Sequence, residues 1–215
     1  MIDKIFPSVH KEGYKFLVIF GVITLILYFI NSFLGLIGLI LTIWCYYFFR
    51  DPERYPINDE DYLVSPADGI VLQVKESKGP KELNLDNKTF TKVSIFMNVF
   101  DCHVNRTPCS GKVSEILYHP GKFFNASLDK ASEDNERNYY KILNQNNEDI
   151  ILVQIAGLIA RRIVCETKVD SEVRQGDRVG MIRFGSRADL YFENYKPLVK
   201  VDQKTIAGET LIAKK

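Results

Sequence analysis

One apolar run near the N-terminus most constrains how this chain folds. Residues 16–49 contain no charged side chain, and only mild polar residues such as Asn31 and Ser32 interrupt the run. As a single helix this segment would be about 51 Å long, well beyond the roughly 30 Å hydrocarbon core of a bilayer. A break at Asn31-Ser32 gives two shorter arms. We therefore predict a membrane-anchoring helical hairpin over residues 1–50, whose arms either cross the bilayer or dip into one leaflet, with both ends on the same side.

The charges that flank the run indicate which side this is. Lys4, Lys11 and Lys15 precede it, and Arg50 and Arg54 follow it. Because basic residues concentrate at the cytoplasmic ends of membrane segments, we expect a cell-membrane protein whose other domain lies on the cytoplasmic side. A cleaved signal peptide is the alternative. The run is much longer than the usual apolar core of about 7–15 residues, however, and no small-residue cleavage motif follows it.

The overall composition narrows the classes of partner and compartment. The 215 residues include 28 basic and 27 acidic side chains, so the net charge of +1 provides no general attraction for nucleic acid, and we expect no nucleic-acid partner. The four cysteines, at positions 45, 102, 109 and 165, form no Cys-x-x-Cys pair. We interpret them as reduced thiols in a cytosolic compartment.

Residues 51–215 have the sequence pattern of a β-rich domain, because short apolar stretches alternate with the turn-forming residues Gly, Pro, Asn and Asp. The predicted strands are 69–74, 91–97, 111–117, 150–155, 163–166, 178–184, 188–192 and 211–213. No Gly-x-Gly-x-x-Gly motif follows a strand, so a dinucleotide-binding fold has no support.

Internal similarity within this domain indicates its architecture. Ser65-Pro-Ala-Asp-Gly-Ile-Val71 and Thr107-Pro-Cys-Ser-Gly-Lys-Val113 predict two copies of one β-turn-β unit. The segment 173–182 has a pattern similar to the hairpins of lipoyl- and biotinyl-carrier domains. Together the three segments favour a mainly β fold that resembles a barrel-sandwich hybrid.

Histidines are few enough to be weighed one by one. His103 lies at a predicted strand end, in a polar cluster with Asp101, Asn105 and Arg106, and such places often form sites. His119 precedes Pro-Gly and has the pattern of a turn residue. A zinc site needs three or four close ligands, whereas His103 belongs to no His-x-His pair, so we expect no metal. This disfavours a membrane-tethered metallopeptidase.

Two further short motifs bear on function. A carrier domain needs an acceptor lysine at a hairpin tip, but Asp129-Lys-Ala131 lies outside any predicted hairpin. Gly185-Ser186 lies between two predicted strands, where the unshielded glycine carbonyl and the adjacent hydroxyl suit an N-to-O acyl shift. Gly-Ser is also a frequent turn dipeptide, so it does not decide the function by itself.

Taken together with its neighbours, this motif resembles the short form of the phosphatidylserine decarboxylase family, pyruvoyl-dependent lipid enzymes. The resemblance runs from the hairpin nearly to the C-terminus. Its motifs are Ser65-Pro-Ala-Asp-Gly69, Asn98-Val-Phe-Asp-Cys-His-Val-Asn-Arg106, the segment from Pro120 to Arg137, Gln154-Ile-Ala-Gly-Leu-Ile-Ala-Arg-Arg162 and Phe184-Gly-Ser-Arg-Ala-Asp-Leu-Tyr-Phe192.

The resemblance implies self-cleavage at Gly185-Ser186 into a β chain, residues 1–185, and an α chain, residues 186–215, which stay together as a heterodimer. Ser186 would become a covalent pyruvoyl group, the only cofactor. A Schiff base between this group and the amine of phosphatidylserine, a phospholipid substrate drawn from the membrane, would allow loss of CO2 and yield phosphatidylethanolamine in phospholipid biosynthesis.

The same resemblance assigns Asp68 and His103 as catalytic residues beside Ser186, with His103 as base or acid. Long-form relatives resemble His-x-x-His here, whereas this chain has Arg106 at the second position. Either His103 serves in both maturation and decarboxylation, or another residue such as His119 takes one of the two steps.

Substrate binding and the choice of lipid are less constrained. Arg106, His119 and Arg161 are candidate substrate-binding residues, since a guanidinium suits bidentate contact with phosphate. An archaetidylserine decarboxylase would share all of these motifs. From a different class, a non-catalytic membrane-tethered carrier or adaptor domain is the remaining alternative.

Overall fold

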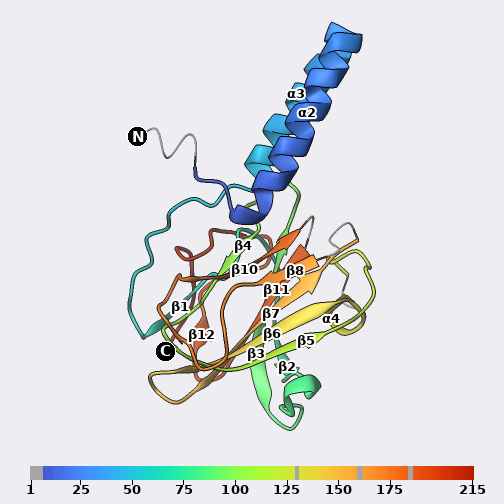
Figure 1. The fold of residues 1–215 in the computed structure, drawn as a ribbon. Helices are drawn as coiled ribbons and strands as arrows, with labels where there is room; N and C mark the ends of the chain where they lie inside the picture. Colours follow the sequence, from blue (N-terminus) through green and yellow to red (C-terminus); the bar gives the residue numbers. More distant parts are fainter. Residues whose placement is uncertain (1–6, 129–130, 159–161, 184–185) are drawn as a thin grey trace. The chain divides into compact units, whose positions relative to one another are not determined.

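The structure is a computed structural model that describes residues 7–128, 131–158, 162–183 and 186–215 (Figure 1). The chain divides into two compact units, residues 1–53 and 54–215. The first is a helical hairpin and the second is built mainly from strands, which confirms the predicted fold class.

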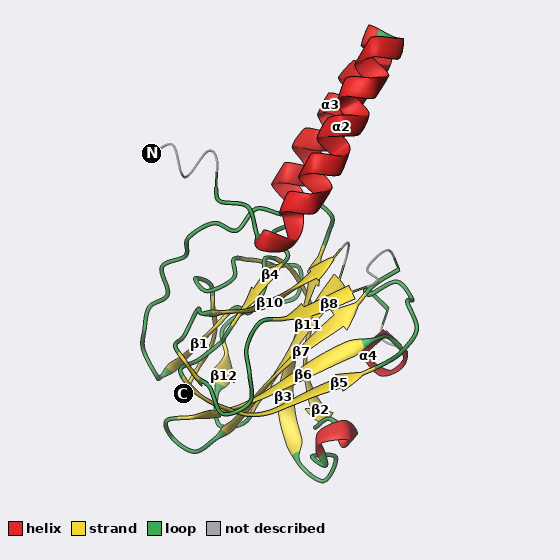
Figure 2. Cartoon of the chain, in the orientation of Figure 1, coloured by secondary structure: helices red, strands yellow, loops and turns green. Residues whose placement is uncertain are grey.

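The hairpin consists of a short 3-10 turn, η1 (Lys11–Gly13), followed by α2 (Tyr14–Ile30) and α3 (Ser32–Phe48) (Figure 2). The helices are separated by Asn31, whose backbone is extended and whose side-chain oxygen accepts a hydrogen bond of 2.8 Å from the Phe33 N–H. Asn31 therefore ends one helix and caps the next. The predicted break in the apolar run is confirmed.

Small residues let the two helices pack closely. A Cβ at Gly35 would lie 2.8 Å from the Cα of Tyr28, and the hydroxyls of Thr24 and Thr42 are 2.9 Å apart across the helix pair. At the open end of the hairpin, the His10 N–H donates to the Phe49 carbonyl at 2.8 Å. Both ends of the apolar run therefore emerge together, as predicted.

The apolar helices are consistent with membrane association. The helical stretch Lys11–Ile30 is 20 residues long, with a mean hydropathy of 2.1, and meets the length and composition of a membrane span. Ser32–Phe48 is apolar but shorter. Whether the hairpin crosses the bilayer or dips into it stays a prediction.

The second unit contains one large curled sheet and two small ones. The order in the large sheet is β13-β2-β3-β11-β7-β6-β5-β9, and the small sheets are β1-β14-β12 and β4-β10-β8. All neighbours in these sheets are antiparallel. The elements are β1 (Tyr62–Val64), β2 (Gly69–Lys78), η2 (Lys81–Leu83), β3 (Thr89–Met97), β4 (Val104–Arg106), β5 (Gly111–His119), α4 (Ala131–Asp134), β6 (Arg137–Asn144), β7 (Asp149–Ala156), β8 (Arg162–Cys165), β9 (Glu172–Val173), β10 (Arg178–Arg183), β11 (Ser186–Phe192), β12 (Lys196–Pro197), β13 (Lys204–Thr205) and β14 (Leu211–Lys214).

Both faces of the large sheet are buried near its centre. Along β11, Ala188, Leu190 and Phe192 point into the main core, whereas Tyr191 packs in a second, smaller cluster on the opposite face. Because side chains alternate along a strand, Ser186 shares the main-core face and Arg187 the other.

The predicted repeat is confirmed in detail. Gly69 and Gly111 begin β2 and β5 with nearly equal φ angles of +156° and +155°. A Cβ at Gly69 would collide with the carbonyl oxygen of Phe96, and one at Gly111 with that of Leu143. Each strand then has a register shift after its third residue, between Val71 and Gln73 in β2 and between Val113 and Glu115 in β5. The two hairpins therefore share one local geometry.

The repeat extends to the strands that flank each hairpin. Thr205 in β13 pairs with Gly69, and Val173 in β9 pairs with Gly111. The β2–β3 and β5–β6 hairpins thus lie on opposite sides of the central β11–β7 pair. The β unit consists of two similar halves that meet at the strand beginning with Ser186.

Within the described residues all eight predicted strands are present, and six further strands were not predicted: β1, β4, β6, β9, β12 and β13. The largest is β6, whose ends carry Arg137, Asn138 and Asn144. These polar residues are typical of a loop in sequence, yet all three are buried here. Arg137 donates to Glu82 Oε1 and Asn144 donates to the Tyr195 hydroxyl, and both partners lie far away in the sequence.

Candidate active site

Ser186 is the first residue of β11 and is completely buried. It pairs with Met97, the last residue of β3, and with Ala156, the last residue of β7. Among the described residues, its Oγ contacts the Met97 Sδ at 3.8 Å. The predicted cleavage partner Gly185 lies outside the described residues. The start of β11 is therefore held on both sides by neighbouring strands.

His103 precedes β4 and is also fully buried. Its Nδ1 lies 3.0 Å from the carbonyl oxygen of Asp101. Because a carbonyl only accepts, this contact assigns the proton to Nδ1 and makes Nε2 the basic nitrogen of the neutral ring. The His103 carbonyl accepts from the Ile182 N–H at 3.3 Å. Its backbone therefore lies beside β10, the strand that leads toward Ser186.

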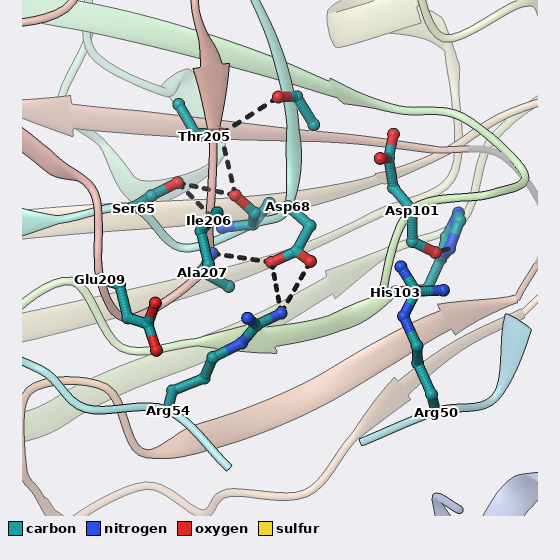
Figure 3. A network of polar contacts seen from close by, with 12 residues as sticks. Arg50, Arg54, Ser65, Asp68, Asp101, His103, Thr205, Ile206, Ala207 and Glu209 are labelled. Carbon is teal, nitrogen blue, oxygen red and sulfur yellow. Dashed lines mark hydrogen bonds and ion pairs between the residues drawn. The ribbon is translucent and has the colours of Figure 1, made fainter. Parts of the chain in front are cut away.

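Asp68 belongs to the turn before β2 and is 9% exposed. Arg54 Nη2 donates to both of its carboxylate oxygens, at 2.7 Å and 3.0 Å, and the Ala207 N–H donates to Oδ1 at 2.8 Å (Figure 3). These are its hydrogen-bond partners among the described residues. The structure therefore does not join Asp68 directly to His103, but ties it to the segment that follows β13.

Backbone contacts strengthen this connection. The Ser65 N–H donates to the Thr210 carbonyl at 2.8 Å, and the Gly208 N–H donates to the Ser65 carbonyl at 2.7 Å. Gly208 has φ +78°, a left-handed conformation that glycine adopts without strain. The turn at residues 65–69 thus holds the segment 205–210, which lies C-terminal to Ser186.

The three predicted substrate-binding residues have different surroundings. Arg106 is 4% exposed, and its Nη1 donates to the Gly176 carbonyl at 2.8 Å. His119 ends β5, with its Nδ1 2.8 Å from the Pro120 oxygen. Since β6 and β7 separate β5 from β11, His119 lies about three strand spacings, or about 14 Å, from the row of Ser186. Arg161 lies outside the described residues.

A buried polar chain on the Ser186 face of the sheet was not predicted from the sequence. Tyr140 Oη donates to Gln154 Oε1 at 2.7 Å, and Gln154 Nε2 donates to Asn105 Oδ1 at 2.9 Å. Asn105 Nδ2 lies 3.4 Å from the same Met97 sulfur that contacts Ser186. The one feature of the sequence that could have indicated this chain is Gln154, a polar amide within the apolar run of β7.

The charged cluster on the opposite face is equally buried. Arg187 Nε donates to Asp189 Oδ1 at 2.6 Å, and Lys92 Nζ lies 2.9 Å from Asp189 Oδ2. Burial disfavours ionisation of Asp189, but the charges of Arg187 and Lys92 outweigh it and hold its pKa below the ordinary value. This cluster fixes the residue that directly follows Ser186.

Candidate metal ligands and the buried Cys109 thiol complete the inventory of reactive groups in the described part of the chain. No group of three or more His, Cys, Asp or Glu side chains is placed to hold a metal ion there. Burial raises the pKa of the Cys109 thiol to about 12, so this thiol stays protonated and unreactive at neutral pH.

Comparison with known proteins identifies the family. The family model for phosphatidylserine decarboxylase matches residues 41–213. The phosphatidylserine decarboxylase proenzyme of Pelagibacter ubique is 73% identical over 215 residues, which cover all of both chains. The proenzyme of Ruegeria pomeroyi is 53% identical over 214 residues, 99% of this chain and 98% of the relative. That of Rickettsia prowazekii is 51% identical, over 98% of this chain and 92% of the relative. The chain therefore belongs to the phosphatidylserine decarboxylase family of carboxy-lyases.

Proposed function

We propose that this chain cleaves itself before Ser186 and then converts phosphatidylserine to phosphatidylethanolamine and CO2 at the new chain end. The observation that carries the proposal is the placement of Ser186 as a fully buried first residue of β11, paired on both sides. The relatives named as proenzymes support the self-cleavage.

In the first step, Ser186 Oγ attacks the carbonyl carbon of Gly185. A C–O ester bond forms as the C–N bond between the two residues breaks, and the freed amine takes up a proton. Removal of the Ser186 Cα proton then breaks the Cβ–O bond and releases residue 185 as a carboxylate. Addition of water and loss of ammonia leave a pyruvoyl group at position 186.

The surroundings of Ser186 fit such a group. Its strand partners are the uncharged Met97 and Ala156, and the Asn105 amide lies against the Met97 sulfur. The seven residues of β11 pair with β3 along their full length, so the new chain end stays fixed after cleavage. The pyruvoyl carbonyl supplies an electron sink for the electron pair left behind when CO2 departs.

We assign proton transfer to His103. Its Nδ1 is held by the Asp101 carbonyl, and the ring can take up and release a proton at Nε2. His103 removes a proton during maturation and returns one to the substrate α-carbon. Asp68 acts as a positioning residue in maturation. Its contacts with Arg54 and Ala207 join a segment that precedes the cleavage site in the sequence to one that follows it.

Turnover of a labelled substrate tests this function. The purified full-length protein is mixed with phosphatidylserine carrying a labelled carboxyl group, and released CO2 and phosphatidylethanolamine are measured together. We expect equal amounts of both products, and none from Ser186→Ala. Archaetidylserine in a parallel assay distinguishes the two lipid substrates. Absence of CO2 from a self-cleaved preparation would contradict the proposed reaction.

Substitutions of the histidines separate the steps. We expect His103→Gln to reduce both self-cleavage and CO2 release, whereas His119→Gln leaves self-cleavage intact because His119 lies three strands from Ser186. Normal self-cleavage and turnover in His103→Gln would remove His103 from the mechanism. Loss of self-cleavage in His119→Gln would instead assign proton transfer during maturation to His119.

A further inference from the structure

Two exposed apolar side chains lie on the loops that leave the strand partners of Ser186. Phe100 follows Met97 at the end of β3 and is 63% exposed, and Leu158 follows Ala156 at the end of β7 and is 65% exposed. Because β3 and β7 flank the first residue of β11, Phe100 and Leu158 follow the two strands that border Ser186.

Two more apolar residues are anchored at the same end of the sheet. Asn135 is fully buried, and its side chain bonds both the N–H and the carbonyl of Phe124, each at 2.8 Å, and the Ala156 carbonyl at 2.7 Å. Arg187 Nη1 donates to the Leu128 carbonyl at 3.4 Å. Phe124 and Leu128 remain 42% and 55% exposed. The described part of the loop between β5 and β6 is thus tied to β7 and to β11.

We propose that these four side chains, Phe100, Phe124, Leu128 and Leu158, form an apolar rim that inserts into the surface of the lipid bilayer from which the substrate comes. The inference rests on the proposed function, since it supplies the reason for a bilayer. A diacyl lipid stays in the membrane, so the buried Ser186 must meet its headgroup at the membrane surface. The rim surrounds the end of the sheet where this meeting takes place.

The chemistry of the rim and the covalent structure of the chain favour a bilayer over a protein partner. Lys122 Nζ lies 5.5 Å from the Phe124 ring, and a cation beside an aromatic ring suits the boundary between headgroups and acyl chains. The apolar α3 ends at Phe48, and the β unit begins at Arg54. A chain connection this short keeps the β unit near any membrane that holds the hairpin. A protein bound permanently over the rim would block the path of the lipid headgroup.

Depth-dependent fluorescence quenching tests the insertion directly. In a Trp44→Phe background, Phe100→Trp and Leu158→Trp each provide a single tryptophan, and the full chain is reconstituted in phosphatidylcholine–phosphatidylserine vesicles with or without brominated acyl chains. Val169→Trp is the matched control: Val169 is 48% exposed, and the adjacent Asp170 N–H bonds the Val113 carbonyl near the start of β5, at the other end of the sheet. We expect the brominated lipid to reduce emission about twofold at positions 100 and 158 and to leave position 169 unchanged.

The other outcomes are equally informative. Unquenched tryptophans at positions 100 and 158 would overturn the insertion, and a blue-shifted but unquenched emission would assign the rim to a second copy of the chain. Quenching needs no turnover, so quenching in a protein that releases no CO2 would support the rim and contradict only the proposed function.

A kinetic comparison adds an independent readout. Phe100→Ser combined with Leu158→Ser is assayed on vesicle phosphatidylserine and on a water-soluble short-chain phosphatidylserine. We expect the ratio of vesicle to soluble turnover to fall about tenfold, which corresponds to about 1.4 kcal/mol, and Val169→Ser to leave it unchanged. An unchanged ratio in the double variant would contradict the rim.

Discussion

Asp68 and Ser110 make the same backbone contact in the two halves of the β unit. Asp68 Oδ1 accepts from the Ala207 N–H at 2.8 Å, and Ser110 Oγ accepts from the Gln175 N–H at 3.0 Å. Each residue directly precedes the glycine that begins its hairpin. What distinguishes Asp68 is its charge and the ion pair with Arg54. The backbone contact is therefore common to both halves of the β unit. The ion pair with Arg54 occurs only at Asp68 and not at Ser110.

Replacing Asp68 by Ser separates these two contributions. The hydroxyl can keep the contact with Ala207, as Ser110 does with Gln175, but Arg54 loses its counter-charge. Because both side chains are largely buried, we expect a loss of about 3–5 kcal/mol in unfolding free energy and slower self-cleavage. Chemical denaturation and gel-resolved cleavage kinetics measure the two effects.

Ser110→Ala is the matched control for this change. It removes one backbone acceptor and should cost only about 1–3 kcal/mol, with self-cleavage unchanged. If Asp68→Ser cleaves itself as fast as the natural sequence, the ion pair has no part in maturation.

The buried polar chain predicts that Gln154→Leu has a large effect. The change leaves the Tyr140 hydroxyl without its 2.7 Å acceptor and Asn105 Oδ1 without its 2.9 Å donor. The Tyr140 hydroxyl keeps the Val179 carbonyl as an acceptor at 3.2 Å, but the unpaired Asn105 oxygen costs about 1–3 kcal/mol, and Asn105 is then freer to move against Met97 beside Ser186. We expect reduced stability together with slower self-cleavage.

Tyr140→Phe provides the comparison, since it removes only the outer member of the chain. It should lower stability less than Gln154→Leu and leave the cleavage rate close to that of the natural sequence. Equal stability and cleavage in Gln154→Leu and the natural sequence would show that the chain does not support the site.

The Asp189 cluster predicts a particular dependence of stability on acid. The folded-state pKa of Asp189 lies below its unfolded value of about 3.9. Its contribution is therefore complete above that value and is lost as the pH falls through the lower, folded pKa. Denaturation between about pH 2 and 7 should show this loss, and Asp189→Asn should flatten the acid limb while lowering stability at pH 7. An unchanged acid limb in Asp189→Asn would assign the loss to other carboxylates.

Cys165 offers a test of the predicted cytoplasmic side. It is exposed, whereas Cys45, Cys102 and Cys109 are buried. In intact spheroplasts a membrane-impermeant maleimide should leave the protein unlabelled, and in inverted vesicles it should label one thiol. Cys165→Ser should abolish the labelling. Labelling in intact spheroplasts would place the β unit on the outer side.

Local features of this chain could be predicted from its sequence, because they depend on neighbouring residues. The helix break at Asn31 and the paired glycines at 69 and 111 follow from apolar length and turn chemistry. Ser186 was expected at a turn before a strand, and it begins the strand itself. By contrast, β6 was missed because Arg137 and Asn144 are polar residues typical of a loop, and their partners Glu82 and Tyr195 lie far away in the sequence. The contacts of Asp68 with Ala207 and of Gln154 with Asn105 join residues far apart in sequence, which no local pattern encodes.

The most direct measurement is the intact mass of the purified protein, compared with that of Ser186→Ala. We expect two fragments separated between residues 185 and 186, with a pyruvoyl group in place of the first serine of the smaller fragment. Ser186→Ala should remain a single full-length chain. A single uncleaved chain in both samples would contradict self-cleavage and favour the non-catalytic membrane-tethered carrier or adaptor domain.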